Sequence, residues 1–323
     1  MTNLATATIL YSPSAIDSYG DCQRQFWYGR NDDGSGRLPT DPLPAAVSSA
    51  LHEALMDYHR QIEGLHLVGS LPDDAQAKAM LGGLLEKSLF RMHVDPADPA
   101  VQERLHKVQP GLERAAALTI QELPRWVADG TVGLLVWPEA KLDHGPGIRA
   151  VQLSPSVLVP TRPDIIGIRS DGGTFRAVVK DYKAKSKVVH PAFDNGILVR
   201  AFWALSEIQA PRCEWFLAGR NLKVDPEAID VETVNLMQAG TADFLIRDTL
   251  TAEILLRHRD RLVAVAEEMA LTDAEVEDTA VPASPSGLCH DWCPFLHRCD
   301  VGQAYIRKYQ GDGTLEARLA EVP

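Results

Sequence analysis

The chain has few cysteines, no long apolar run and no excess of positive charge, and each shortage narrows what it can be. No stretch of its 323 residues reaches the apolar length that a membrane-spanning helix needs, so no membrane partner is expected. The N-terminal segment lacks the cationic start and the apolar core of a signal peptide. We therefore expect a cytoplasmic protein, in which the five cysteines are reduced and serve a metal or cluster rather than disulfides.

Acidic residues outnumber basic ones, 44 Asp and Glu against 32 Lys and Arg, which gives a formal net charge of −12. This balance weakly disfavours a nucleic-acid partner, but net charge is a poor guide when charge is unevenly spread. Between Arg162 and Lys187 the sequence has seven basic residues and three Asp, whereas residues 225–278 are strongly acidic. The basic island is a candidate phosphate-binding surface, although a solvated strand edge also accounts for Lys185 and Lys187.

A predicted β-hairpin at residues 163–183 gathers two carboxylates and a lysine. If Gly172 and Gly173 form the tight turn, Asp164 lies directly opposite Asp181, and Lys183 points to the same face. Two adjacent carboxylates repel each other unless a cation joins them, so the pattern predicts a divalent metal. The competing interpretation is a surface hairpin with charged edges. The rest of the shared face is apolar, which favours a buried face: Ile166, Ile168, Phe175, Ala177 and Val179.

The order of the expected elements indicates an α/β fold with one mixed central sheet flanked by helices. Expected helices cover 14–30, 45–64, 73–129 (broken at residues 95–99, Pro110 and Pro124), 195–209 and 242–271. Expected strands cover 134–143, 148–153, 157–169, 175–185, 213–220 and 228–237.

Three cysteines, Cys289, Cys293 and Cys299, are spaced Cys-x3-Cys-x5-Cys in a segment with little regular structure. Such a segment buries too little core to order itself, and a bound metal or cluster would supply the missing stabilisation. A fourth thiolate is needed. We favour Cys22, among polar and aromatic residues, over Cys213, which sits in an apolar strand pattern typical of a small buried side chain.

The identity of the metal remains open at this point. Four thiolates suit either zinc or an iron–sulfur cluster. His290 and His297 lie within the cysteine run and can replace a cysteine in a zinc site, although solvated loop histidines are equally compatible.

The motifs occur together in one order along the chain: YSPSAIDSYGDCQRQFWY at 11–28, SALHEAL at 49–55, PDIIGI at 163–168, VVKDYKAK at 178–185 and CHDWCPFLHRC at 289–299. In this order they resemble the RecB-like branch of the PD-(D/E)xK nuclease family. The resemblance is greatest to its members with a C-terminal iron–sulfur cluster, including the CRISPR-associated exonucleases and the AddB nuclease domain.

The resemblance implies a restriction-endonuclease-like fold in a single nuclease domain over residues 1–323. Within it we expect a helical subdomain at 45–130, a catalytic sheet core at 131–240 and a cysteine segment at 282–301 joined to Cys22. It also implies a structural 4Fe–4S cluster that staples the two ends of the chain, with the ligands Cys22, Cys289, Cys293 and Cys299.

For the active site, the resemblance implies that His52, Asp164, Asp181 and the backbone carbonyl of Tyr182 bind Mg²⁺ or Mn²⁺. Lys183 would position or deprotonate the attacking water. The implied activity is that of a hydrolase, a metal-dependent DNA exonuclease acting on single-stranded ends in replication, recombination or repair.

DNA contacts are expected from basic and aromatic side chains. Phosphates would be contacted by Arg162, Lys180, Lys185 and Lys187, and unstacked bases by Trp27 and Tyr28. One departure from the family favours an alternative function. Val199 and Trp203 occupy the places of its Gln-x3-Tyr motif. The alternative is a DNA-end-binding accessory protein with little or no cleavage and a structural cluster or zinc site.

Overall fold

The computed structural model describes residues 9–31, 42–126, 150–161, 164–171, 174–209, 224–275, 277–286, 289 and 293–320. Its α-helices are α1 (Pro13–Asp21), α2 (Gln23–Asn31), α3 (Leu43–Leu67), α4 (Asp74–Arg91), α5 (Pro99–Trp126), α6 (Asn195–Gln209), α7 (Ala252–Asp273), α9 (Asp300–Gln310) and α10 (Asp312–Leu319). Its strands are β1 (Ile9–Leu10), β2 (Ala150–Gln152), β3 (Val157–Pro160), β4 (Ile165–Asp171), β5 (Thr174–Lys183), β6 (Val224–Asn235) and β7 (Leu245–Thr251). Short 3₁₀ turns include η2 (Pro191–Phe193), η3 (Leu236–Gln238) and η6 (Leu296–Arg298).

The chain divides into two compact units. Unit 1 comprises Met1–Pro42, Gln152–Pro160 and Asp260–Pro323, and unit 2 comprises Leu43–Val151 and Thr161–Arg259. The hairpin with its two carboxylates belongs to unit 2, and the four cysteines of the described chain belong to unit 1. Each unit is therefore considered by itself.

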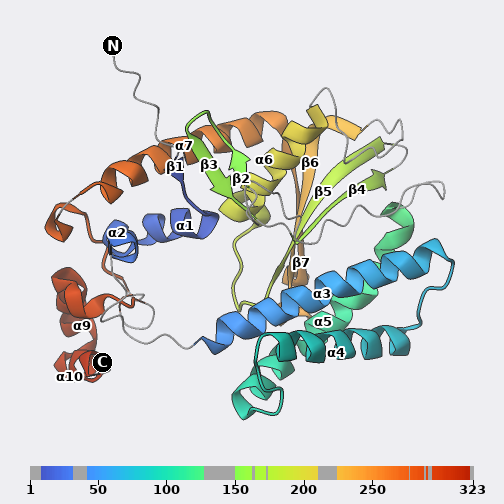
Figure 1. The fold of residues 1–323 in the computed structure, drawn as a ribbon, viewed down its shortest axis with the longest axis horizontal. Coiled ribbons are helices and arrows are strands. Elements are labelled where there is room, and N and C mark those ends of the chain that lie inside the picture. The colour runs from blue at the N-terminus through green and yellow to red at the C-terminus, as the bar shows by residue number, and fades with distance from the viewer. Residues whose placement is uncertain are drawn as a thin grey trace. The chain divides into compact units, whose positions relative to one another are not determined.

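Unit 2 is built on a four-stranded sheet in the order β4-β5-β6-β7 (Figure 1). β4 and β5 are antiparallel, β5 and β6 are parallel, and β6 and β7 are antiparallel. A parallel pair needs a crossover connection, and α6 supplies it between β5 and β6. α6 packs on β5 and β6 from one side, while α3 and α5 lie on the other (Figure 1). The predicted fold class, α/β with a mixed sheet flanked by helices, is confirmed.

The hairpin has the predicted register. Asp171 pairs with Thr174, and the last paired residues before the carboxylates are Ile165 and Lys180. One step further places Asp164 opposite Asp181. The predicted burial of the shared face is correct for Ile166, Ile168, Ala177 and Val179, which are all at most 3% exposed, whereas Phe175 is only partly buried.

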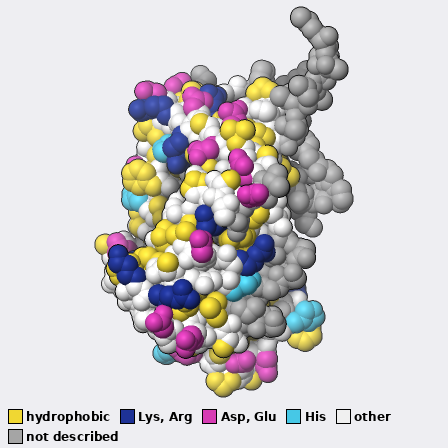
Figure 2. Space-filling model, turned by 90° about the vertical axis from the view of Figure 1, so that its left-hand side faces the viewer, with side chains coloured by type: hydrophobic (Ala, Val, Ile, Leu, Met, Phe, Trp, Pro, Cys, Tyr) yellow, Lys and Arg dark blue, Asp and Glu magenta, His cyan; other side chains and the backbone are white. Residues whose placement is uncertain are grey.

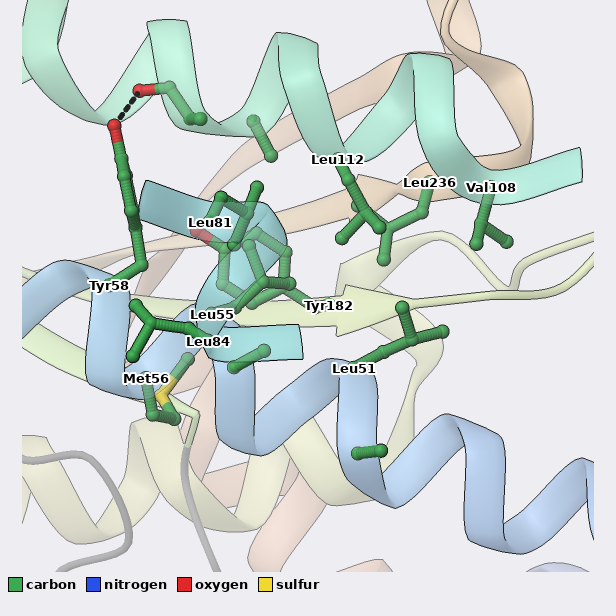
Figure 3. Packing of buried hydrophobic residues seen from close by; sticks show 14 of the residues in the cluster. Leu51, Leu55, Met56, Tyr58, Leu81, Leu84, Val108, Leu112, Tyr182 and Leu236 are labelled. Carbon is green, nitrogen blue, oxygen red and sulfur yellow. Dashed lines mark hydrogen bonds between the residues drawn. The ribbon is translucent and has the colours of Figure 1, made fainter. Parts of the chain in front are cut away.

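The main core of unit 2 lies between the sheet and the three helices α3, α4 and α5 (Figure 3). The side chain of Tyr182 projects from β5 into this cluster, among Leu55 and Leu84. Complete burial of such leucines contributes about 1.5–3 kcal/mol each. Since successive strand residues point to opposite faces, Tyr182 is held in the core while its neighbours Asp181 and Lys183 point the other way.

α5 corrects one prediction, because it continues through both Pro110 and Pro124. A proline inside a helix removes one backbone hydrogen bond and usually kinks or ends it. The adjacent Gly111 lies against η3: a Cβ at this position would overlap the backbone of Leu236. α5 and η3 therefore approach more closely than a residue larger than glycine would permit. This packing outweighs the tendency of Pro110 to end the helix.

β7 corrects a second prediction, that of a helix over residues 242–271. Residues Leu245–Thr251 form an antiparallel strand against β6, and the helix begins only at Ala252. Thr251 ends the strand and caps the helix, with its Oγ1 accepting a hydrogen bond from the N–H of Ile254 at 3.3 Å. Residues 245–251 form a strand because the β6 backbone supplies hydrogen-bond partners, which the local sequence does not reveal.

Unit 1 contains α1 and α2 where one continuous helix was expected. Ser12 caps α1 as predicted, with Pro13 in the first turn, but the chain is extended at Cys22 (φ −161°, ψ 111°). The described chain also has a three-stranded sheet, in the order β1-β3-β2. One central sheet was predicted, so the described chain differs in having two.

The distribution of surface charge does not mark a binding face on the side shown in Figure 2. On the face shown in Figure 2, acidic and basic side chains of the described residues are interspersed. None of the described helices combines the length and the apolar character that crossing a membrane requires.

Candidate functional site

Asp164 and Asp181 meet where the hairpin strands end. One carboxylate oxygen of Asp164 accepts a hydrogen bond from the backbone N–H of Tyr182 at 2.8 Å. The side chain of Asp164 is 13% exposed and that of Asp181 is 3% exposed. The strand register thus brings together two nearly buried carboxylates, as the sequence predicted.

His52 reaches this pair from α3. Its Nδ1 lies 3.0 Å from the other carboxylate oxygen of Asp164. Burial by itself would lower the pKa of His52, but the nearby carboxylate of Asp164 outweighs burial and raises the pKa. His52 and Asp164 therefore form a charge-assisted pair whose members are 112 positions apart in sequence.

Asp181 is balanced by two cations. Lys183 Nζ lies 2.6 Å from Oδ2 of Asp181, and Nη1 of Arg200 donates to Oδ1. Burial would raise the pKa of Asp181, but the positive charges of Arg200 and Lys183 prevail and hold it well below its usual range. Lys183 also lies 3.3 Å from Asp194, and these two carboxylates outweigh burial to raise the pKa of Lys183. Lys183 is therefore a protonated ammonium at neutral pH.

Arg200 is the site residue that the sequence analysis missed. It comes from α6, where the neighbouring Val199 is fully buried. Arg200 also donates through Nε to Oγ1 of Thr161 at 3.1 Å. A signal was available, because Arg200 is the only charged residue within the run ILVRAFWAL, and a charge on a buried helix face needs a partner. The helix after β5 thus presents an arginine to Asp181, one position after Val199, which stands where the resembled family has glutamine.

Tyr182 is anchored on the opposite face of the sheet from Asp181. Its hydroxyl is 2.6 Å from Nε2 of His59, inside the core of unit 2. Burial, together with the charge of Lys180, lowers the pKa of His59 to about 3, so that this histidine is neutral. Within an extended strand a residue's N–H and C=O point to the same edge. Since the Tyr182 N–H points to Asp164, its carbonyl is turned toward that edge as well.

The donors at this site are those that Mg²⁺ and Mn²⁺ accept, namely carboxylates, a carbonyl and one imidazole. The 3.0 Å between His52 and Asp164 equals the spacing of neighbouring ligands in an octahedron of radius about 2.1 Å. A cleft of about 400 Å³ adjoins both residues, with Ser48 and Met92 in its wall. Among the described residues, however, no three His, Cys, Asp or Glu side chains already converge as the ligands of one ion. The residues fit a divalent cation by type, while Asp181 is ion-paired instead.

Lys180 was predicted to contact phosphate, and the structure contradicts this. It is 2% exposed and lies 2.6 Å from Glu122 and 3.1 Å from Glu232. Burial would raise the pKa of Glu232, but Lys180, Arg247 and Arg169 lower it to about 2. The alternation that aims Asp181 and Lys183 at the site necessarily turns Lys180 to the other face.

Trp27 and Tyr28 were predicted to stack on bases, and this too is contradicted. They are 8% and 1% exposed and pack with Phe295 in a core cluster of unit 1. Trp27 Nε1 donates to the carbonyl of Glu275, and the Tyr28 hydroxyl donates to the carbonyl of Arg298. Their polar atoms are satisfied inside the fold. Trp203, in unit 2, is also buried, at 7% exposed.

The other residues predicted to contact DNA or a metal are either exposed or outside the described residues. Lys185 and Lys187 are exposed in the segment that follows β5. Arg162 and Cys213 lie outside the described residues, as does His290.

The four cysteines of the described chain line one pocket in unit 1: Cys22, Cys289, Cys293 and Cys299. His297 is not among the described residues that line it. Burial raises the pKa of Cys293 to about 12, and the neighbouring thiols add to the effect. The structure therefore brings together the predicted set across more than 260 positions of sequence.

Backbone amides point at these sulfurs. Cys22 Sγ accepts from Ser284 N–H at 3.5 Å, and Cys299 Sγ accepts from Gly302 N–H at 3.4 Å. Cys289 Sγ accepts from the N–H of Ser286 at 3.4 Å. Such hydrogen bonds surround the thiolates of metal and iron–sulfur centres and stabilise their negative charge.

With fold and sites described, the comparison with known families identifies the chain. It matches the PD-(D/E)XK nuclease superfamily over residues 11–300 and belongs to that superfamily. Membership implies a hydrolase that acts on DNA, and nucleases of this superfamily typically use Mg²⁺ or Mn²⁺. The mixed sheet agrees with a restriction-endonuclease-like fold. A search of curated proteins finds no significant match.

Proposed function

We propose that this chain is a metal-dependent exonuclease that acts on single-stranded DNA ends, in replication, recombination or repair. The observation that carries the proposal is the meeting of Asp164, Asp181, Lys183 and His52 at one end of the hairpin, in a chain of a nuclease superfamily. Aspartates paired across strands and a lysine two residues further on are the parts that give the superfamily its name.

His52, Asp164, Asp181 and the Tyr182 carbonyl would hold Mg²⁺ or Mn²⁺. When bound, such an ion lowers the pKa of a coordinated water and neutralises charge on the scissile phosphate. Oδ2 of Asp181 is the atom for which Lys183 and the ion compete, since Lys183 Nζ lies 2.6 Å from it. The Nδ1 of His52 faces an Asp164 oxygen across 3.0 Å, and His52 would have to give up the proton of this hydrogen bond to bind the ion.

Lys183 acts as a cation rather than as a base. Its raised pKa keeps the ammonium protonated near neutral pH, because Asp181 and Asp194 outweigh burial. A protonated lysine beside the carboxylates can donate hydrogen bonds to the attacking water and stabilise negative charge as it develops on the phosphate. It does not take the proton from that water.

Arg200 positions Asp181. It holds one carboxylate oxygen while its own Nε is fixed on Thr161. The guanidinium remains charged at every working pH and presents several donors in a fixed plane. In this proposal Arg200 keeps Asp181 ionised and oriented. A neutral residue at the same place would stabilise the ionised carboxylate less.

The cysteine pocket would hold a 4Fe–4S cluster as a structural staple. One zinc ion requires all sulfurs at about 2.3 Å, whereas the thiolates of a cluster bind separate irons and stand further apart. The four thiols share a pocket, yet no three of them are grouped for a single ion among the described residues. The preference for a cluster over zinc rests on the resemblance of the cysteine run to family members with a C-terminal iron–sulfur cluster.

The second candidate is a DNA-end-binding accessory protein that cleaves weakly or not at all. The ion pairs on both oxygens of Asp181 favour it, because they satisfy the buried charge without a metal. The absence of the Gln-x3-Tyr pair at Val199 and Trp203 also favours it.

Degradation of end-labelled single- and double-stranded DNA, with and without Mg²⁺ or Mn²⁺, separates the two candidates. An exonuclease shortens the strand from one end and stops in EDTA. An accessory protein retains the label at full length but still binds. For the cysteine site, anaerobic purification with iron and zinc analysis decides: thiolate-bound iron gives a brown protein absorbing near roughly 400 nm, whereas zinc leaves it colourless.

A further inference from the structure

The aromatic residues first expected to contact bases are buried, but the structure offers another one beside the site. Phe193 is 69% exposed and closes η2, directly before Asp194. Asp194 is the carboxylate that lies 3.3 Å from Lys183. An apolar ring therefore stands in solvent one residue away from a contact of the proposed catalytic lysine.

The backbone around Phe193 is fixed although its ring is exposed. Its N–H donates to the carbonyl of His190 at 2.8 Å. The N–H of Ala192 donates to Nδ1 of His190 at 3.3 Å, and Pro191 restricts the turn further. The rings of His190 and Phe193 are 6.0 Å apart. A ring held this way loses little freedom on binding, which favours recognition.

Cations accompany this ring. Lys185 and Lys187 are both exposed in the short stretch between Lys183 and η2. Ser186, between them, is tied to η3 because its carbonyl accepts from Gln238 Nε2 at 3.2 Å. Exposed cations followed by an exposed aromatic ring are the two components of surfaces that bind single strands: a charged track for phosphates and a flat face for bases.

Resting on the proposed nuclease function, we propose that residues 185–193 form a single-strand platform, on which Phe193 stacks against an unpaired nucleobase and Lys185 and Lys187 contact the adjoining phosphates. Base pairs inside a duplex are covered on both faces by their neighbours, so the ring can stack only on unpaired bases or on the last pair of an end. The platform lies next to the candidate site, because Asp194 follows Phe193 directly and lies 3.3 Å from Lys183.

The test is binding without cleavage. The full-length chain in EDTA is titrated into a fluorescein-labelled twelve-nucleotide oligo(dT) and into an abasic strand of equal length, followed by anisotropy. Phe193→Ala should weaken oligo(dT) binding about 5- to 150-fold, the range for one stacked base, and leave abasic binding unchanged. Phe193→Trp should bind oligo(dT) at least as well as the wild type.

Phe90→Ala is the matched control, because Phe90 is also an exposed phenylalanine of unit 2, 80% exposed on α4. It should change neither titration. Lys187→Gln should weaken both probes and reduce the slope of log Kd against log salt by about 0.7, while Lys87→Gln on α4 should not.

Equal oligo(dT) affinity of Phe193→Ala and wild type would overturn the platform, as would an equal loss in Phe90→Ala or on the abasic strand. No binding of oligo(dT) by the wild type would overturn it too. These outcomes are independent of catalysis: a wild type that binds through Phe193 but never cleaves with Mn²⁺ refutes the nuclease and keeps the platform.

Discussion

The two candidate sites of this chain solve the problem of burying reactive groups in opposite ways. In unit 2, the buried Asp181 keeps its charge because Arg200 and Lys183 neutralise it. In unit 1, burial and the neighbouring thiols raise the pKa of Cys293 to about 12, so this thiol is protonated at neutral pH. In our proposal, the first site is balanced by its own side chains, and the second would be completed by a bound metal centre.

The difference shows which site depends on its own side chains and which depends on what it binds. Because two cations balance its carboxylate, the site in unit 2 is stable without a bound metal ion. Substitution of a catalytic residue there should therefore lower the cleavage rate more than it lowers stability. Buried thiols around a pocket gain most of their stabilisation from a bound centre, so removal of a cysteine should affect folding more than chemistry. The predictions below test this contrast, from the largest expected effect to the smallest.

Lys183→Ala should lower the cleavage rate about 1000-fold, equivalent to about 4 kcal/mol of transition-state stabilisation. Lys183 is 25% exposed, and Asp181 keeps Arg200, so the melting temperature should fall only slightly. Rates on end-labelled DNA and a thermal melt check both statements. Lys87→Ala, at an exposed lysine of α4 outside both candidate sites, is the control for charge alone. A rate within threefold of wild type would show that Lys183 is not catalytic.

Cys293→Ser should lower the unfolding free energy by several kcal/mol, as loss of a structural metal centre does, and should remove bound iron. Cys22→Ser should have the same effect, because both sulfurs line one pocket although they come from opposite ends of the chain. Cys213→Ala is the control and should keep its colour and bound iron. A brown, stable Cys22→Ser protein would contradict the assignment and make Cys213 the candidate.

Arg200→Gln should reduce stability by about 2 kcal/mol at pH 7, less than for a pair with no second cation, because Lys183 remains. The lowered pKa of Asp181 makes its contribution fully present above the usual value of 3.8 and lost as pH falls through the folded value. Without Arg200 that folded pKa rises, so acid unfolding should begin at higher pH.

Urea unfolding of Arg200→Gln between pH 7 and pH 3 measures this shift, and Asp181→Asn in the same chain should cancel most of it. Arg200→Lys should restore stability in part and cleavage only weakly, since lysine lacks the planar fork. Unaltered acid stability in Arg200→Gln would exclude a role in keeping Asp181 ionised.

Gly302→Ala should give the smallest effect on stability, because the preference of α9 for alanine, about 1 kcal/mol, offsets the closer packing, and it should reduce iron content. A Cβ there would stand 3.2 Å from Leu296, 3.5 Å from Cys299 Sγ and 3.7 Å from Cys289 Sγ. The methyl group would thus enter the space between two proposed ligands. Iron per chain and a thermal melt report the effect, with Gly313→Ala in α10 as control because nothing lies near its Cβ. Full iron content in Gly302→Ala would place the cluster elsewhere.

The hairpin was predictable because its register follows from counting. A turn at two glycines fixes Asp164 opposite Asp181, and strand alternation then fixes the direction of Lys183. The same alternation turns Lys180 toward the core with Glu122 and Glu232, although its place in a basic stretch predicted a phosphate contact. His52 came from the family motif and not from any pattern in α3.

The misses share a cause, because each depends on partners distant in sequence. β7 is a strand only because β6 lies beside it, and α5 passes Pro110 because η3 packs at Gly111. Trp27 is buried because the C-terminal segment covers it. In the sequence, Arg200 is a single charged residue in an apolar helix. Its role becomes visible only from the position of Asp181, which it contacts in the fold.

Asp181→Asn most directly tests the central claim that the hairpin end is the active site of a metal-dependent nuclease. The measurement is shortening of 5′-labelled single-stranded DNA with Mn²⁺, Mg²⁺ or EDTA, for wild type and Asp181→Asn at equal folded concentration. We expect cleavage by the wild type with either ion, none in EDTA, and at least about 1000-fold slower cleavage by the variant. Wild-type rates in a folded Asp181→Asn protein, or cleavage in EDTA, would contradict the claim.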